Sequence, residues 1–366
     1  MTGAAPLTVL SAFSAFAVGG PQVRFAAIAN RFGRRYRHAV VSMSGDLACR
    51  ERLDPGLDLS YPALDVRKGD TAGMVRRLRA LLRELRPDVL VTSNWGCIEW
   101  AMANQLSGRP LVRHVHMEDG FGPEERERQA PRRVWTRRLV LRRSTVVLPS
   151  RVLWRIATEQ WRLPERRLRY VPNGVDLSRF AASPHPGARD GEPVVGTVAA
   201  LRAEKNLPRL LRAFARAAAD VPGRLVVVGG GPERPGLERL AAELGIAGRV
   251  RFAGELAAPQ AEYAGFSLFA LSSDTEQMPL SVLEAMAAGL PVAATDVGDV
   301  RAMLDPANGP YVVPKDDDAL AGALRTLLRD PAAARGIGAA NRTRAEREFD
   351  QDAMFRTYAA LFDGAA

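Results

Sequence analysis

The feature that most constrains the fold is an alternation of short apolar runs with longer amphipathic runs. The apolar runs cover residues 7–13, 38–44, 88–94, 110–116 and 145–150 in the first half, and 194–200, 224–230, 249–254, 266–273 and 291–296 in the second. Such alternation is typical of βαβ units, in which helices cover both faces of a parallel sheet. The chain is therefore expected to be an α/β protein.

The alternation is interrupted at residues 182–194, which read "ASPHPGARDGEPV". Proline, glycine and polar residues crowd this stretch, as is typical of a linker. A chain of 366 residues is long enough for two domains that each have their own core. We therefore expect two doubly wound α/β domains joined by a short hinge.

The cysteines and the first twenty residues indicate the compartment. Cys49 and Cys97 are too few for a disulfide framework or a cysteine-based zinc site, which suits a reducing environment. The start, "MTGAAPLTVLSAFSAFAVGG", lacks a basic n-region, and its apolar run is too short and broken to span a bilayer. We expect a cytoplasmic protein without a cleaved signal or a transmembrane helix.

The positive charge is concentrated in one segment. The net charge is +10, and fourteen arginines against five glutamates place +9 of it between residues 121 and 170. Within this segment, "PRRVWTRRLVLRR" (131–143) combines paired arginines with one apolar stripe, formed by Val134, Trp135, Leu139 and Val140. Such a stripe is either ordinary core or a docking surface, and each basic residue near an anionic leaflet contributes about 1 kcal/mol. We expect peripheral docking on the inner face of the cytoplasmic membrane, through Arg137, Arg138, Arg142 and Arg143.

The same charge, with a pI of about 10.3, also raises nucleic-acid binding as an alternative from another class. Single-stranded nucleic acids are bound by exposed aromatic side chains that stack on bases. The basic segment lacks interleaved aromatics of this kind, and Trp135 and Trp154 fall where amphipathic helices are expected to bury them. Nucleic acid is therefore not expected as a partner.

Ligands of doubly wound domains bind beyond the carboxyl ends of the strands, so the loops there are the first candidates. Gly19 and Gly20 follow the first strand and precede a helix expected at residues 21–32, where an anion can be approached closely by the backbone. Arg202 and Lys205 lie just before a helix expected to start near Pro208. Cations at that end oppose the helix dipole, so we expect an anion between them.

A third loop, Gly229–Gly231, follows another strand but lacks the full G-x-G-x-x-G spacing. Gly230 and its neighbours either approach a ligand or form a tight corner.

Two carboxylates, Glu276 and Glu284, stand eight positions apart at the start of an apolar helix that we expect to run from near Pro279 to Gly289. About 12 Å would separate them along a helix, too far for a glycosidase pair at about 5 to 10 Å. The spacing suits two hydroxyl-bearing groups of one extended ligand. An anion would bind between them at the free amides of Met278, Leu280 and Ser281.

Four segments together resemble the retaining glycosyltransferases of family 4, which have the GT-B fold. They are "YVPNGVDLSRF" (170–180), "LRAEKN" (201–206), "VVVGGGPERPGLERL" (226–240) and the Glu276–Glu284 stretch with "EAMAAGLPVAAT". The resemblance implies two Rossmann-like domains that face a central cleft. Residues 1–181 would bind the acceptor and 182–349 the nucleotide-sugar donor, with a C-terminal helix at about 350–366 packed back on the first domain.

The resemblance also implies retaining hexosyl transfer from a nucleotide-diphosphate sugar to a hydroxyl of a glycan or lipid-linked acceptor in surface polysaccharide synthesis. No cofactor and no metal would be needed. Lys205 and Arg202 would neutralise the diphosphate, and Glu284 would hold the ribose hydroxyls. Glu276 and the residues after it, Pro279 included, would hold the sugar and phosphate.

In the first domain, the resemblance places the Gly19–Gly20 loop toward the diphosphate or acceptor and His116 near the reacting sugar. His114 is expected on the opposite face of its strand. Two positions in the second domain depart from the family pattern: Ala199-Ala200 stand where many members have Gly-Arg, and Pro279 stands where they have glycine.

Two acidic clusters are weighed as metal sites and set aside. His116, Glu118 and Asp119 alternate around one short turn without a second His or Cys group, which favours an acceptor loop. Asp316–Asp318 precede a periodic helix, so an N-cap is expected there. A nucleotide-sugar epimerase of the same fold stays open as an alternative, although the Glu276–Glu284 segment is not expected in one.

Overall fold

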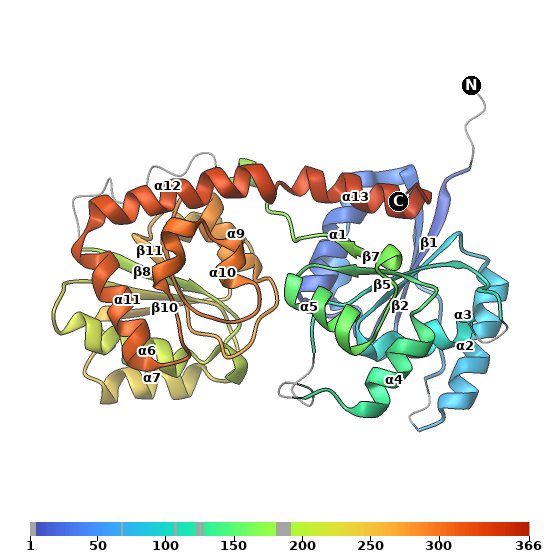
Figure 1. Ribbon diagram of the computed structural model, residues 1–366, viewed down its shortest axis with the longest axis horizontal. Helices are drawn as coiled ribbons and strands as arrows, with labels where there is room; N and C mark the ends of the chain where they lie inside the picture. Colours follow the sequence, from blue (N-terminus) through green and yellow to red (C-terminus); the bar gives the residue numbers. More distant parts are fainter. Residues whose placement is uncertain are drawn as a thin grey trace. The chain divides into compact units, whose positions relative to one another are not determined.

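The computed structural model describes residues 5–66, 69–105, 108–121, 125, 128–180 and 192–365. The chain divides into two compact units: unit 1 holds Met1–Pro172 and Phe355–Ala366, and unit 2 holds Asn173–Met354 (Figure 1). The linker expected at 182–194 lies mostly outside the described residues, since the description resumes at residue 192 and a strand begins at Val194.

Unit 1 is built on a seven-stranded sheet in which all pairs are parallel, in the order β3-β2-β1-β4-β5-β6-β7. Its strands are β1 (Leu7–Phe13), β2 (Tyr36–Ser42), β3 (Leu59–Ser60), β4 (Val89–Ser93), β5 (Arg113–Met117), β6 (Thr145–Leu148) and β7 (Leu168–Tyr170). The order reverses between β1 and β4, which makes the loops after these strands the topological switch point of this unit.

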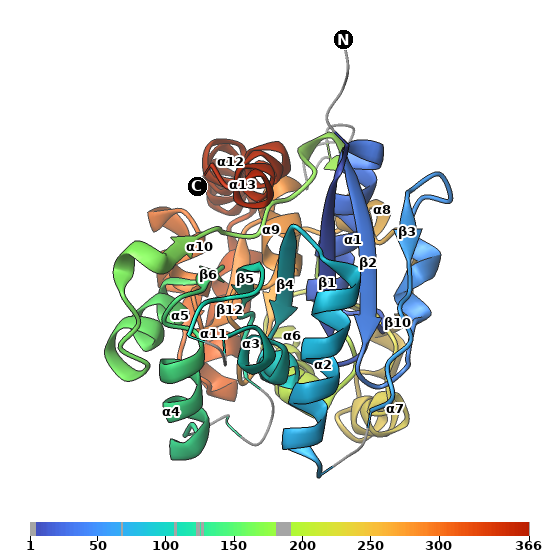
Figure 2. The same cartoon turned by 90° about the vertical axis from the view of Figure 1, so that its right-hand side faces the viewer.

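The helices of unit 1 are α1 (Gly20–Phe32), α2 (Thr71–Leu85), α3 (Ile98–Gln105), α4 (Pro131–Val140) and α5 (Arg151–Arg155). α2 packs against α3 (Figure 2) and turns Leu78 and Leu82 to a core that contains Leu10 and Leu90 of the sheet. Phe25 of α1 packs in a second cluster with strand residues of opposite parity, such as Val40. Alternate strand residues therefore serve helices on the two faces, as the apolar runs predicted.

Unit 2 repeats the plan with a six-stranded parallel sheet in the order β10-β9-β8-β11-β12-β13. The strands are β8 (Val194–Val198), β9 (Arg224–Val228), β10 (Val250–Gly254), β11 (Leu268–Leu271), β12 (Val292–Thr295) and β13 (Val312–Val313). The helices are α6 (Leu207–Ala218), α7 (Arg234–Glu243), α8 (Gln260–Tyr263), α9 (Leu280–Ala287), α10 (Val300–Met303), α11 (Asp317–Arg329) and α12 (Pro331–Glu348). Here the switch point falls between β8 and β11.

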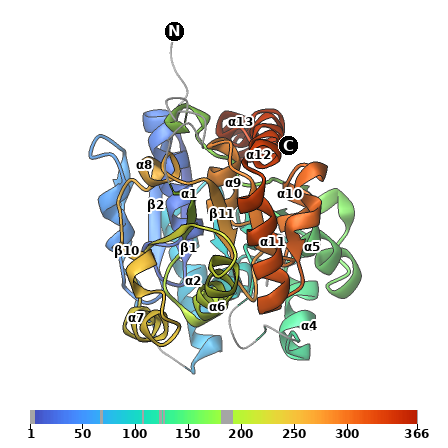
Figure 3. The same ribbon diagram turned by 90° about the vertical axis from the view of Figure 1, so that its left-hand side faces the viewer.

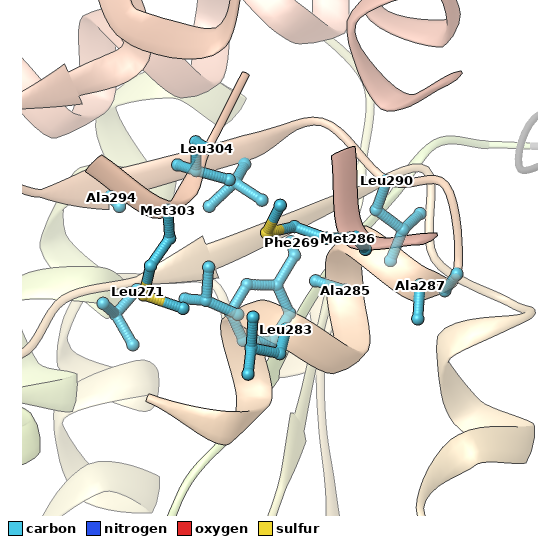
Figure 4. Close-up of a cluster of buried hydrophobic side chains, with 14 of the residues drawn as sticks. Phe269, Leu271, Leu283, Ala285, Met286, Ala287, Leu290, Ala294, Met303 and Leu304 are labelled. Atoms are coloured by element: carbon cyan, nitrogen blue, oxygen red, sulfur yellow. The ribbon is translucent and has the colours of Figure 1, made fainter. Parts of the chain in front are cut away.

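The sheet of unit 2 separates two apolar clusters. On one face, α6 and α11 lie side by side over Val195, Leu225 and Ala270 (Figure 3). On the other face, Leu283 and Met286 of α9 pack with Phe269, Leu271, Met303 and Leu304 (Figure 4). The buried side of α9 is thus fixed firmly, and this orients the polar residues at its start.

The C-terminal helix α13 (Gln351–Asp363) joins unit 1 from Phe355 onward. Phe355 and Phe362 contact the rings of Phe32 and Tyr36, and the Tyr36 hydroxyl donates a 2.9 Å hydrogen bond to Asp363 Oδ1. Unit 1 ends at Pro172, nine residues before the expected domain boundary at 181.

All ten apolar runs of the sequence are strands. The three further strands are β3, β7 and β13, which have two or three residues each. Runs this short carry no recognisable period, so the pattern did not predict them.

Candidate functional site

The loops after β8 and β11 meet at the switch point of unit 2 and bring Lys205 to Glu276. Lys205 Nζ donates a 2.6 Å hydrogen bond to Glu276 Oε1, and Ser273 Oγ donates to the same oxygen at 2.7 Å. The Lys205 and Glu276 side chains retain 24% and 11% exposure. An ammonium and a carboxylate therefore stand side by side at the edge where ligands of such sheets bind.

A second ion pair, between Arg209 and Asp274, joins α6 to the loop after β11. Arg209 of α6 donates 2.8 Å hydrogen bonds to the Ser272 carbonyl and to Asp274 Oδ1. Asn206 caps α6 through its side chain and also donates to the Asp274 carboxylate at 3.2 Å. Arg209 and Asp274 were not predicted as site residues, and the sequence signal near them is Asn206, an N-cap residue three positions before Arg209.

The start of α9 presents backbone N–H groups. Pro279 is its N-cap residue, and the amides of Val282 and Leu283 donate to the Pro279 carbonyl, so α9 begins as predicted. The amides of Leu280 and Ser281 have no acceptor within the helix at these first positions. Asn173 Nδ2 donates to the Met278 carbonyl at 2.9 Å and fixes the loop just before them.

Glu284 lies half-buried on α9 and has a specific partner. The Tyr263 hydroxyl donates a 2.8 Å hydrogen bond to Glu284 Oε2. Burial raises the pKa of Glu284 above its usual value, and the bond from Tyr263 and the charge of Arg179 lower it in part. Tyr263 is itself fully buried and stacks on Phe269, so it was not recognisable as a polar residue of the site from the sequence.

The Gly229–Gly231 loop forms a tight corner. A Cβ at Gly229 would stand 1.9 Å from the Ala199 carbonyl oxygen, and one at Gly231 would stand 2.4 Å from that of Leu201. The Gly230 carbonyl accepts a hydrogen bond from the Leu201 amide at 2.8 Å. These glycines are therefore required for packing of the loop after β9 against the loop after β8, and a ligand contact at Gly230 stays a prediction.

Arg202 and Gly20 are exposed to solvent, and Gly19 is half-buried. Arg202 is exposed, and within the described part of the chain its side chain has no hydrogen bond or ion pair. α1 begins at Gly20, one residue before the expected start, so Gly19 is its N-cap, and nothing lies within 4 Å of a Cβ built at Gly20. The Gly19–Gly20 loop follows β1, at the switch point of unit 1.

His116 lies at the same edge of unit 1, in β5. Its Nδ1 is 2.8 Å from Thr92 Oγ1, and His114 Nε2 is 2.9 Å from the same oxygen. The expectation that His114 occupies the opposite face is wrong, because residues two apart on a strand share one face. Both imidazoles are buried.

The acids after β5 pair with buried arginines. Asp119 takes a bidentate pair from Arg24 at 2.6 and 2.7 Å, and Glu118 Oε2 accepts from Arg137 Nε at 3.1 Å. Arg137 is fully buried among the rings of Trp95, Phe121 and Trp161. The expectation that Arg137 belongs to the basic surface is therefore wrong, because two carboxylates, of Glu118 and Glu125, draw it inward.

The remaining acidic cluster is an N-cap, as predicted. Asp316 Oδ1 accepts a 2.8 Å hydrogen bond from the Ala319 amide, and Asp317 and Asp318 pair with Arg212 and Arg216. Across the described ranges, three or more His, Cys, Asp or Glu side chains are nowhere grouped so as to hold a metal ion.

The outer face of α4 is apolar and basic. Trp135 and Leu139 are 58% and 62% exposed, so the expectation that a helix buries Trp135 is wrong. Arg138 lies 5.0 Å over the Trp135 ring, while Arg142 and Arg143 beyond the helix are exposed. Val134 and Val140 turn inward and pack on a core cluster. None of the helices in the described ranges combines the length and apolar character that crossing a bilayer requires.

Two Rossmann-like parallel sheets, each with candidate binding loops at its switch point, define a two-domain α/β protein of the GT-B fold. A family model described as "Glycosyltransferase Family 4" matches residues 18–179, and one described as "Glycosyl transferases group 1" matches residues 178–344. The chain belongs to glycosyltransferase family 4, which confirms the resemblance seen in its motifs. Neither an epimerase nor a nucleic-acid-binding protein is favoured by these matches.

Among relatives, a D-inositol 3-phosphate glycosyltransferase of Thermobispora bispora is 31% identical over 329 residues, which cover 78% of this chain and 75% of the relative. A GDP-mannose-dependent alpha-(1-6)-phosphatidylinositol monomannoside mannosyltransferase of Mycolicibacterium smegmatis is 35% identical over 197 residues, or 49% of this chain. The match spans about half of that relative, at 52% of its length.

Among solved structures, HepE of Anabaena in complex with UDP superimposes with a TM-score of 0.80 at 21% identity. The superposition covers 98% of this chain and 100% of HepE. At this level of identity the likeness shows the shared fold.

Proposed function

We propose that this protein transfers a sugar from a nucleotide-diphosphate sugar to a hydroxyl of a glycan or lipid-linked acceptor, with retention of anomeric configuration and without a metal. The observation that carries the proposal is the Lys205–Glu276 pair at the switch point of unit 2, 2.6 Å apart and beside the open amides at the start of α9. A donor of this kind has an anionic diphosphate next to a sugar rich in hydroxyls. The ammonium suits the first group and the carboxylate suits the second.

The chemistry assigned to these residues is stabilisation of the leaving group. Negative charge develops on the diphosphate as the glycosidic bond breaks, and a fixed cation with aligned N–H groups lowers the energy of that state. Lys205, the amides of Leu280 and Ser281, and the exposed Arg202 supply these groups. A nucleotide released in this way needs no metal to balance its charge.

Retention is proposed without a covalent intermediate. A double displacement needs a carboxylate free to act as the nucleophile. Glu276 is held by Lys205 and Ser273, and Glu284 is held by Tyr263. The acceptor hydroxyl would therefore attack from the face that the diphosphate leaves, and His116 of unit 1 would contact the reacting sugar.

The nature of the two substrates is proposed from the relatives. HepE has been solved with UDP-glucose, and the M. smegmatis enzyme uses GDP-mannose and a phosphatidylinositol mannoside. Glu284, oriented by Tyr263, would accept hydrogen bonds from the ribose hydroxyls, which UDP and GDP share. A lipid-linked acceptor in surface-glycan synthesis fits a protein that works at the membrane surface.

We also propose that α4 docks on the anionic inner face of the cytoplasmic membrane. Trp135 and Leu139 are exposed large apolar side chains, and Arg138, Arg142 and Arg143 are close to them in sequence. Aromatic and aliphatic side chains insert at the interface while arginines pair with anionic headgroups. The protein would then stay on one side of the membrane as a peripheral enzyme.

Transfer is tested by incubating the protein with UDP-glucose or GDP-mannose and lipid-linked or free glycan acceptors, with and without EDTA. Lys205→Ala and Glu276→Ala are expected to lower turnover by about 10²-fold or more. Lys315→Ala, which removes an exposed lysine of the same unit, serves as the matched control. Near-normal transfer by either site variant, full loss with EDTA, or conversion of the nucleotide sugar without an acceptor would each contradict the proposal.

Docking is tested by sedimentation with anionic and neutral vesicles. Wild type is expected to bind anionic vesicles at low salt only, and binding is expected to fall after Trp135→Ser with Leu139→Ser, and after Arg138→Gln with Arg142→Gln. Arg335→Gln, at an exposed position of α12, is the control. Equal binding to both vesicle types would contradict the membrane-docking proposal and would not affect the proposal of sugar transfer.

A further inference from the structure

A continuous line of buried polar groups leads to His116 through the sheet of unit 1. Ser144 Oγ is 2.7 Å from His114 Nδ1, His114 Nε2 is 2.9 Å from Thr92 Oγ1, and Thr92 Oγ1 is 2.8 Å from His116 Nδ1. All four residues are at most 4% exposed. The donor and acceptor roles along such a line are coupled, because each hydroxyl has one proton and each neutral imidazole has one N–H.

Glu118, next to His116, determines the direction in which the groups of this line donate their hydrogen bonds. Glu118 Oε2 accepts a hydrogen bond from Arg137 Nε, and the same oxygen is 3.6 Å from His116 Nε2. An acceptor oxygen at this distance favours a proton on the facing ring nitrogen and disfavours a lone pair there. This contact favours the N–H at His116 Nε2, which would leave Nδ1 as an acceptor.

The remaining roles then follow one from another. If His116 Nδ1 accepts, Thr92 must donate its O–H to it, so Thr92 Oγ1 accepts from the N–H at His114 Nε2. His114 Nδ1 in turn accepts from the Ser144 hydroxyl, and Gln105 Nε2 donates to Ser144 Oγ at 3.2 Å. Each group donates once in the same direction, and no two donors face each other.

The neutral state of His114 agrees with this direction. Burial, with a smaller contribution from His116, lowers the pKa of His114 from 6.5 to about 3. A neutral ring has one N–H, which this line places on Nε2.

We propose that Thr92, His114 and Ser144 are positioning residues that, with Glu118, hold His116 as the Nε2–H tautomer, so that His116 acts as a hydrogen-bond donor and not as a base. Within the described residues, His116 Nε2 and Glu118 Oε1 have no hydrogen-bond partner although both are buried. A donor beside an acceptor matches a single hydroxyl group, which can accept from one and donate to the other. On the proposed function, that group would be a hydroxyl of the reacting sugar.

The tautomer is tested by nitrogen NMR of protein labelled with ¹⁵N-histidine at neutral pH. The chain has four histidines, so His116→Gln assigns the signals of His116, and His38→Leu with His185→Leu identifies the remaining ones as those of His114. We expect a pyrrole-type shift at Nε2 of His116 and a pyridine-type shift at Nδ1. Thr92→Val, which keeps the shape and removes the hydroxyl, should move the Nδ1 signal, and Thr92→Ser should restore it.

A pyrrole-type shift at Nδ1, a fully protonated ring, or spectra that Thr92→Val leaves unchanged would overturn the proposal. If Thr92→Val does not fold, Ser144→Ala interrupts the same line at its far end and is expected to move the His114 Nδ1 signal. The spectra need no substrate, so their result is independent of whether the chain transfers sugar. In an active preparation, Thr92→Val is expected to lower kcat about tenfold with little change in KM for the donor, as for lost alignment of a reacting group.

Discussion

Removing the hydroxyl of Tyr263 tests the proposal that the site in unit 2 binds a nucleotide through Glu284. Tyr263→Phe deletes the donor of the 2.8 Å bond to Glu284 Oε2 and of a 3.2 Å bond to the Ser281 carbonyl, and it leaves the stacked ring in place. A hydrogen bond to a charged group contributes about 1.5 to 3 kcal/mol. Since 1.4 kcal/mol is a factor of ten, the affinity for UDP or GDP is expected to fall by about tenfold or more if Glu284 contacts the ribose.

The pH dependence gives a sharper signature. Burial raises the pKa of Glu284 and the Tyr263 bond lowers it, so the phenylalanine variant should have a still higher pKa. In the proposed role, Glu284 would accept hydrogen bonds from the ribose hydroxyls fully only as the carboxylate. Affinity should therefore decline as the pH falls through this pKa, and the decline should begin at a higher pH in Tyr263→Phe than in wild type.

Isothermal titration with UDP and GDP from neutral to mildly acidic pH measures both effects. Tyr311→Phe is the matched control, since this tyrosine lies against the apolar cluster on the other face of the same sheet. A 2′,3′-dideoxy nucleotide lacks the ribose hydroxyls and should bind both proteins equally. Coincident pH profiles for wild type and Tyr263→Phe, or an equal loss with the dideoxy nucleotide, would refute the assignment of Glu284 to the ribose.

Two further predictions concern stability. Burial lowers the pKa of His38 from 6.5 to about 4, so below pH 6.5 the unfolded chain binds more protons than the folded one and stability is lost as the pH falls toward 4. His38→Leu should reduce this loss in acid unfolding of unit 1, and an unchanged acid profile would contradict it. Gly229 has φ 139° and a Cβ there would meet the Ala199 carbonyl oxygen at 1.9 Å, so Gly229→Ala should cost about 3 kcal/mol and lower the Tm. Gly336→Ala, on α12 where a Cβ meets no other atom, should raise the Tm slightly. Equal Tm values for the two variants would contradict the conclusion that Gly229 is required for the tight turn after β9.

The fold was predictable because its signal is local. Buried parallel strands need continuous apolar runs and their helices need an apolar face, so ten strands and the starts of α1, α6 and α9 followed from periodicity, proline and glycine. The edge strands β3 and β13 were not predictable, since each has two residues and is defined by pairing with a neighbour. The positions of Lys205 and Glu276 in loops beyond strands, and of Glu284 on the helix that follows, were predicted by the same rules.

What the sequence concealed is which charges are paired. Arg137 lies in a stretch with three other arginines, Arg132, Arg133 and Arg138, and its sequence neighbours resemble theirs. Of these four, Arg137 alone is fully buried. Its partners, Glu118 and Glu125, lie between β5 and α4. The alternation of strands and helices does not predict the path of the chain there. A cage of three aromatic rings makes this burial tolerable because a guanidinium is weakly hydrated and stacks on π faces.

The sequence motif predicted His116 as a site residue but gave no sign of the residues that we propose to orient it. A histidine at the end of a strand is visible as a motif, whereas Thr92 and Ser144 are ordinary β-strand and loop residues whose hydroxyls acquire a role only through the register of β4 against β5 and β6. The register of β4 against β5 places Thr92 opposite His116. No residue taken alone in the sequence predicts this register. The parts of a site that act through other residues therefore become visible only when strand pairing is known.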